Sequence, residues 1–313
     1  MLGKTAGGLF WMFRYLERSE NTARMLEAGL RMSLTRSGAA ESEWTSIITT
    51  TGLRDAYLAR HEEVEASRVI DFLLHDKSNP GSVLSAAESA RNNARLVRTA
   101  LTREVWEAVN ESYLVLKDIL ARPVRDRELP HVLRTVRQRS GFVRGALHGS
   151  MLRNDIYDFA RIGSFFERAD STARILDVKY YILLPSVTYV GSPTDNVQWE
   201  SILRATSSVR AYQTVNEGDP DARSIAEFLI LDHRLPRSLA FCYAKIVGNM
   251  RYLERQYARR MPSHDLAARI SQRFTDNDID AIFEHGLHEF VTEFLTDSQA
   301  LGLQIERDYR FNE

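Results

Sequence analysis

The sequence predicts an all-α protein: a helical bundle of about a dozen helices, formed by tandem duplication of one helical unit with pseudo-twofold symmetry. Three observations support this prediction. Apolar residues recur at steps of three and four along most of the chain, which is the spacing of one helix face. Only 16 glycines and 8 prolines interrupt the 313 residues, and no convincing strand pattern is present. Similar blocks of sequence return after roughly half the chain.

Helix-breaking residues predict where the helices end. Asn79-Pro80 offers an asparagine N-cap followed by a proline at the first helical position, so a new helix is expected to start there. The segment 184–196 contains two prolines and a glycine and is expected to be the longest irregular connection. The breakers in chain order are residues 37–38, 77–81, 122–130, 184–196, 216–220, 261–263 and 275–278.

Three blocks repeat in the same order, with a slowly growing offset. Residues 17–27 match 167–177, residues 44–48 match 199–203, and residues 72–82 match 228–238. This order indicates a duplication, with repeats at approximately 1–150 and 151–313. Because the turn signal at the junction is weak, we expect one all-helical domain over residues 1–313 with a shared core.

Composition excludes several function classes. The net charge of -1 provides no field that would attract nucleic acid or anionic lipid. The single cysteine, Cys242, cannot form an internal disulfide and suits a reducing compartment. No stretch approaches the roughly 20 apolar residues that cross a bilayer. We therefore expect a cytoplasmic protein with no membrane or nucleic-acid partner; a homo-oligomer remains possible.

A charged stripe is the main candidate site. Glu17, Glu20, Arg24 and Glu27 fall within about 80° of one helix face. The second repeat carries the same pattern on Glu167, Asp170, Arg174 and Asp177. In each copy the arginine stands four residues after the second acid, which predicts an ion pair within the helix. The neighbouring apolar residues indicate that these carboxylates lie along the core-facing side.

Two interpretations of this stripe remain open. One is a buried network of ion pairs that fixes how two related helices cross. The other is a polar pocket that binds a ligand. A metal site is not predicted, because the Glu-x-x-His pattern of di-iron bundles is missing and an arginine in each copy would compete with a cation. No cofactor is predicted either.

Secondary candidates lie where two apolar runs end before a proline. Asp76 and Asp232 are expected in turns between helices. In the second copy, Arg234 and Arg237 follow closely and would form an anion site near a helix N-terminus. The first copy has Gly81 in place of Arg237, so such a site would exist on one side only. The basic run 134–144 is expected to be a solvated helix face.

The blocks at residues 1–24, 166–177 and 228–238 resemble the bacterial alpha-E domain family, a group of helical proteins of unknown function. The likeness spans essentially the whole chain. Such proteins are typically encoded beside circularly permuted ATP-grasp ligases and transglutaminase-like peptidases. The resemblance therefore implies these two partners, and it implies no catalytic residue.

Two functions follow as expectations. The first is a non-catalytic accessory protein of an ATP-grasp type ligase system that acts on a peptide or amide linkage. It predicts an internally paired stripe and an exposed apolar or mixed patch. The second is an enzyme or small-molecule binder that uses the stripe, with the carboxylates as acid and base. It predicts a pocket through which solvent reaches these side chains.

Overall fold

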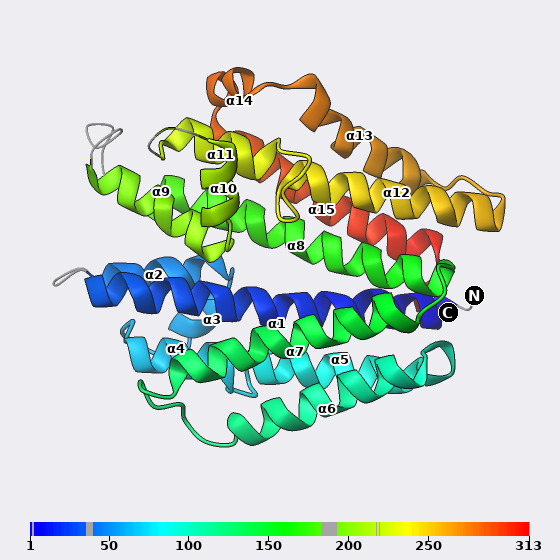
Figure 1. The fold of residues 1–313 in the computed structure, drawn as a ribbon, viewed down its shortest axis with the longest axis horizontal. Coiled ribbons are helices and arrows are strands. Elements are labelled where there is room, and N and C mark those ends of the chain that lie inside the picture. Colours follow the sequence, from blue (N-terminus) through cyan, green and yellow to red (C-terminus); the bar gives the residue numbers. More distant parts are fainter. Residues whose placement is uncertain (2, 36–39, 183–192, 217, 219, 313) are drawn as a thin grey trace.

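The computed structural model describes residues 1, 3–35, 40–182, 193–216, 218 and 220–312, and this part of the chain is all-helical. Two long helices, α1 (Gly3–Thr35) and α8 (Asp155–Ile182), run side by side through the centre of the molecule (Figure 1). Their first turns lie together, since the amino group of Met1 is 3.7 Å from Asp155. The prediction of an all-α bundle is confirmed.

The remaining helices follow each central helix in the same order. After α1 come α2 (Ala40–Thr50), α3 (Arg54–Leu58), α4 (Ala66–Leu74), α5 (Val83–Leu96), the 3-10 helix η1 (Arg98–Ala100), α6 (Arg103–Ile119) and α7 (Leu129–Ser150). After α8 come α9 (Pro193–Ala205), α10 (Val209–Val215), α11 (Ala222–Ile230), α12 (Leu239–Tyr257), α13 (Pro262–Asp276), α14 (Ile279–His285) and α15 (Leu287–Asp308).

The two series also pack in the same way. Helix α1 packs against α5 and α7, and α8 packs against α12 and α15. The pairs α5–α6 and α6–α7 correspond to α12–α13 and α13–α15. In Figure 1 helices α4 to α7 lie below the central pair, and α11 to α14 lie above it. This arrangement agrees with two related units; the duplication that would have produced them stays a prediction.

The centre is held by apolar side chains from both series. Leu9, Phe10 and Phe13 of α1 share one buried cluster with Phe159 and Phe166 of α8. The two backbones approach closely at Gly163, where an added Cβ would lie 2.2 Å from the carbonyl oxygen of Phe10. Each unit therefore completes the core of the other. Among the described residues, no helix is both long and apolar enough to cross a membrane.

Several helix boundaries differ from the sequence expectation. Helix α5 begins at Val83 with Ser82 as its N-cap, and Asn79 accepts instead from the backbone N–H of Gly81. The expected start at Asn79-Pro80 was wrong by three residues, because the asparagine stabilises a turn before the helix. Residues 183–192 lie outside the described residues, and α9 already starts at Pro193, so the end of the expected irregular segment is helical.

Candidate functional site

Two Glu-Arg pairs meet where α1 crosses α8. Glu17 accepts two hydrogen bonds from Arg168, at 2.8 and 2.9 Å. Glu167 accepts in return from Arg18, at 2.5 and 3.1 Å. The exchange is possible because the two helices run in the same direction and place both pairs at the same level. Bidentate pairs of this kind fix both distance and orientation.

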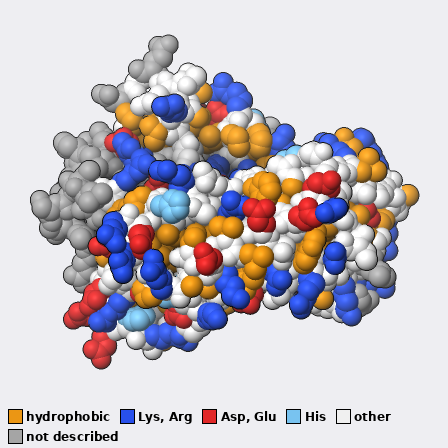
Figure 2. Space-filling model, turned by 60° about the horizontal axis from the view of Figure 1, so that its bottom comes forward, with side chains coloured by type: hydrophobic (Ala, Val, Ile, Leu, Met, Phe, Trp, Pro, Cys, Tyr) orange, Lys and Arg blue, Asp and Glu red, His pale blue; other side chains and the backbone are white. Residues whose placement is uncertain are grey.

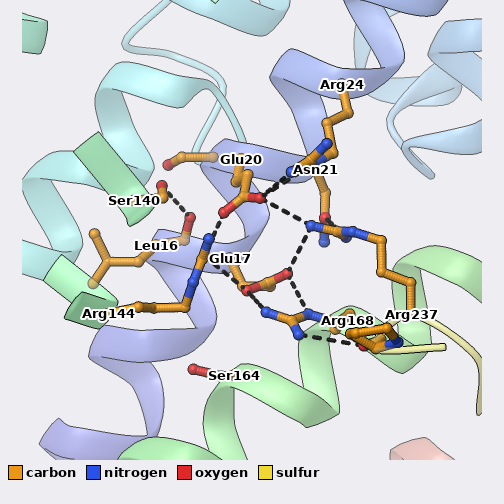
Figure 3. A network of polar contacts seen from close by, with 12 residues as sticks. Leu16, Glu17, Glu20, Asn21, Arg24, Ser140, Arg144, Ser164, Arg168 and Arg237 are labelled. Carbon is orange, nitrogen blue, oxygen red and sulfur yellow. Dashed lines mark hydrogen bonds and ion pairs between the residues drawn. The ribbon is translucent and has the colours of Figure 1, made fainter. Parts of the chain in front are cut away.

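The half of the site around Glu17 and Glu20 is sealed. Both carboxylates are only 1% exposed. Arg144 of α7 reaches both of them, and Arg237, just before α12, lies 2.9 Å from Glu20 and 3.5 Å from Glu17 (Figure 3). Arg24 adds the expected pair within the helix, 2.6 Å from Glu20. Four guanidinium groups thus surround two carboxylates.

This crowding changes the protonation equilibria. Burial alone would raise the pKa of Glu17, but the charge and hydrogen bonds of Arg168, with Arg237 and Arg144, hold it far below its ordinary value. The pKa of Glu20 is also lowered, because Arg144, Arg237 and Arg24 outweigh burial and the nearby Glu17. Burial lowers the pKa of Arg237 to about 10, although Glu17 opposes this shift. Both carboxylates are therefore ionised and poorly suited as general bases.

The half around Glu167 and Asp170 has fewer partners. Glu167 is held by Arg18 and by Arg14, whose guanidinium lies 2.8 Å away and stacks over the ring of Trp11. Arg174 forms the expected ion pair with Asp170, at 2.7 Å. Arg18 and Arg174 are 33% and 41% exposed, so solvent reaches this half.

A cavity of about 240 Å³ opens onto this second half. Its walls combine charged and hydroxyl-bearing side chains from α1 and α8 with the turn after α2 and the turn before α5. The lining residues are Arg18, Asn21, Thr22, Met25, Thr50, Thr51, Gly52, Leu53, Gly81, Glu167, Asp170, Ser171 and Arg174. The charged stripe is thus a closed ion-pair network in one copy and the wall of a pocket in the other.

The ends of the stripe lie apart from both halves. Glu27 pairs with Arg137 of α7 at 2.9 Å and with Arg31 at 3.0 Å. Asp177 pairs with His288 of α15 at 2.6 Å. The stripe is therefore divided into four groups of contacts, the two halves of the site and the two ends. No group of three or more His, Cys, Asp or Glu side chains suited to a metal ion occurs among the described residues.

The secondary candidates take different places. Asp76 accepts from the backbone N–H of Ser78 and Asp232 from that of Arg234, so both stabilise turns as expected. The exposed Arg234 pairs with Asp232 at 2.7 Å. Arg237 instead turns inward to Glu20, so the two arginines do not form a joint anion site. That expectation was wrong, because Arg237 is largely buried and its guanidinium is already paired with Glu20 and Glu17.

Sequence reasoning missed the cross-helix partners. Arg18 and Arg168 follow Glu17 and Glu167 directly, and a step of about 100° placed them off the stripe. Their repetition in both copies was the available signal. Arg144 belongs to the run 134–144, which was expected to be solvated, yet it reaches Glu17 and Glu20 on α1. The expectation failed because an arginine stem is long enough to carry its charge inward.

The fold and site together define an all-helical protein whose two central helices exchange Glu-Arg ion pairs. The chain belongs to the Alpha-E family, described as a predicted alpha-helical domain with a conserved ER motif, which matches residues 1–309. Glu-Arg dipeptides occur at 17–18 and 167–168, the exchanging pairs, and also at 254–255 and 306–307.

Relatives among curated proteins are themselves uncharacterised. An uncharacterised protein of Mycobacterium bovis is 24% identical over 263 residues, which cover 78% of this chain and 29% of the relative. An uncharacterised protein of Mycobacterium tuberculosis is 23% identical over the same shares. The chain thus spans less than a third of the length of these relatives. No solved structure gives a significant match.

Proposed function

We propose that the chain is a non-catalytic helical partner of an ATP-grasp type carboxylate–amine ligase, in a cytoplasmic system that makes or modifies a peptide or amide linkage. A transglutaminase-like peptidase is the second partner in this proposal. The observation that carries it is the length of the relatives: the matched segment is 29% of each of them, so a related unit is joined to a much longer chain. A unit of this kind commonly works beside other domains.

The sealed half of the site supports a structural role for much of the stripe. Glu17 and Glu20 are ionised, buried and saturated with arginine partners, so they hold helices together and have no free oxygen for a substrate. The ER motif named for the family corresponds in this proposal to the exchanging pairs at 17–18 and 167–168. The alternative function, an enzyme or small-molecule binder, rests on the open half alone.

A mixed surface on α6 and α7 is our candidate contact for the ligase. Leu114 and Phe142 are about half exposed, at 51% and 48%. Arg139 pairs with Glu111 and lies over the ring of Phe142, which brings charged and apolar groups together. Figure 2 shows one face on which hydrophobic side chains lie in small groups among both signs of charge. Interfaces combine an apolar centre with a polar rim in this way.

Co-purification tests the proposal. The full chain and the ATP-grasp ligase encoded beside it are expected to elute as one complex, and the ligase is expected to form its product faster with the chain present. Phe142→Asp should weaken the complex, because it removes the apolar ring from the contact and places there a charge that must lose its water on binding. Leu303→Asp, at an equally exposed position on α15, serves as the matched control. Separate elution together with an unchanged ligase rate would refute the partnership.

A further inference from the structure

The two halves of the site differ at one backbone position. Ser82 caps α5 and Ser238 caps α12, and α5 packs on α1 as α12 packs on α8. The residue before each cap is Gly81 in the first series and Arg237 in the second. Arg237 extends its guanidinium to Glu20 and Asn21 of α1. Gly81 has no side chain, and the cavity lies beside it.

The carboxylates show the consequence of this difference. Glu20 is paired with three guanidinium groups, those of Arg24, Arg144 and Arg237, and is 1% exposed. Asp170, its counterpart on α8, is paired with Arg174 and is 22% exposed. A carboxylate has about four lone-pair sites, so Asp170 retains acceptor capacity toward the cavity.

The charges of the two halves match once Arg237 is left out. The first half then holds two carboxylates, Glu17 and Glu20, and the guanidinium groups of Arg24, Arg144 and Arg168. The second half holds two carboxylates, Glu167 and Asp170, and the guanidinium groups of Arg14, Arg18 and Arg174. The first half nevertheless accommodates Arg237 as a fourth guanidinium, on Glu20 and Glu17, and in the second half the partly exposed Asp170 has no such partner among the described residues.

The same cavity also offers hydrogen-bond donors. The side-chain amide nitrogen of Asn21 is buried with no hydrogen-bond partner in the described part of the chain, and Asn21 lines the cavity. The guanidinium groups of Arg18 and Arg174 are partly exposed on its walls. Buried donors without partners are rare in folded proteins. An acceptor oxygen on the ligand would satisfy them.

We propose that this cavity binds an arginine, as the free amino acid or as a residue of a peptide. Its guanidinium lies on Asp170 and Glu167, where Arg237 would lie if the two halves were alike. Its carboxylate or peptide carbonyl oxygen accepts from Asn21 and Arg18. The site does not depend on the ligase partnership, because all its groups belong to this chain.

A ligand series on the full chain tests the chemistry by isothermal titration calorimetry. L-Arginine is expected to bind, and agmatine, which lacks the carboxylate, to bind more weakly. L-Citrulline has the same shape without the charge and should bind at least about tenfold more weakly than arginine, since it loses charge-assisted hydrogen bonds. Equal binding of citrulline, tighter binding of L-glutamate than of arginine, or no binding of arginine or of an arginine-containing tripeptide would overturn the proposal.

Filling the cavity from within provides a second test. Gly81→Arg places a guanidinium where Arg237 stands in the other half, and should abolish arginine binding while the thermal unfolding midpoint stays the same or rises. Gly81→Ala is the matched control, because it adds the same Cβ, 3.0 Å from Leu53, and should keep binding. If Gly81→Arg does not fold, Asp170→Asn is measured and should bind at least about tenfold more weakly. Undiminished binding in the folded variant would overturn the proposal.

Discussion

Glu17 and Glu167 hold equivalent positions on neighbouring helices and differ in how much of their charge is compensated by buried partners. Glu17 is reached by Arg168, Arg144 and Arg237, whereas Glu167 is reached by Arg14 and Arg18. A buried ion pair adds little net stability compared with an apolar pair, but losing one partner is costly. The residues of the first half are therefore the sensitive ones.

The first prediction concerns Arg168, which is 11% exposed. Arg168→Ala should lower the free energy of unfolding by about 3–5 kcal/mol, because it leaves the buried Glu17 without its bidentate partner. Urea denaturation at neutral pH measures the loss. Arg18→Ala is the control and should cost less than half as much, since Arg18 is 33% exposed and water can reach the oxygens of Glu167 that it leaves, whereas Glu17 is 1% exposed. Equal losses would show that the two halves are equally important for folding.

The second prediction concerns Asp158 at the start of α8. Burial raises its pKa to about 6, only partly opposed by Arg153 and Arg161, and one of its oxygens has no hydrogen-bond partner in the described chain. The folded protein therefore binds a proton more tightly than the unfolded chain, whose aspartate has a pKa near 3.8. The contribution of Asp158 to stability consequently declines as the pH rises from about 4 to about 6.

Asp158→Asn should accordingly raise the free energy of unfolding at pH 7 by an amount on the order of 1–3 kcal/mol, and change it little at pH 4. Urea denaturation at both pH values measures this difference. Asp155→Asn is a suitable control. Asp155 accepts a hydrogen bond from the Tyr257 hydroxyl at 2.6 Å, so this variant should have a lower free energy of unfolding at pH 7. A uniform effect of Asp158→Asn at both pH values would contradict the raised pKa.

At the scale of the element, the approach of α1 to α8 depends on a glycine. Gly163 lies against the backbone of Phe10, and the corresponding position of α1 carries the bulky Phe13. The two central helices are thus unequal here, because the lack of a side chain at Gly163 lets the backbone of α8 approach the backbone of α1 at Phe10. Backbone cannot move aside as the end of a side chain can, so this contact fixes the helix spacing.

The third prediction follows from that contact. Gly163→Ala should destabilise the protein by about 3 kcal/mol, because its Cβ would overlap the carbonyl oxygen of Phe10 and force the helices apart. Thermal unfolding by circular dichroism measures it. Gly145→Ala on α7 is the control: nothing lies within 4 Å of its added Cβ, so helix propensity should leave stability unchanged or raise it by up to about 1 kcal/mol. A tolerated Gly163→Ala would mean that α1 and α8 can separate.

At the scale of the whole molecule, the two units depend on each other. Helix α1 buries Phe10 and Phe13 in the cluster that α8 completes, and the Glu-Arg pairs cross the same boundary. A unit taken alone would expose these rings and leave ionised groups without partners. One domain over residues 1–313 therefore stays our prediction.

The fourth prediction concerns the separated halves. Residues 1–150 and residues 151–313, expressed alone, should each lack a cooperative thermal transition, because each loses the opposite wall of its core. The full chain should unfold in one transition. Mixing the two fragments is the control and should restore helicity and cooperativity. A fragment that melts cooperatively near the temperature of the full chain would establish two independent domains.

The sequence by itself determined what depends on neighbours along the chain. The all-α class, the repeated blocks and the ion pairs Arg24–Glu20 and Arg174–Asp170 follow from a helical period that places residues four apart on one face. The turn roles of Asp76 and Asp232 were equally local. The exact first residue of α5 did not follow from the sequence, because several residues before it are able to cap a helix.

Only the tertiary structure decided which charges meet and which space stays open. Arg168, Arg144 and Arg237 reach Glu17 or Glu20 from separate elements, and their contacts depend on how α7, α8 and α12 pack on α1. The sequence showed that Gly81 occupies the position that Arg237 has in the second repeat. Only the fold shows that a cavity lies beside Gly81 and Asp170. The physical reason is that a long arginine side chain pairs with the carboxylates that lie near it in space, and the order of residues along the chain does not specify which ones these are.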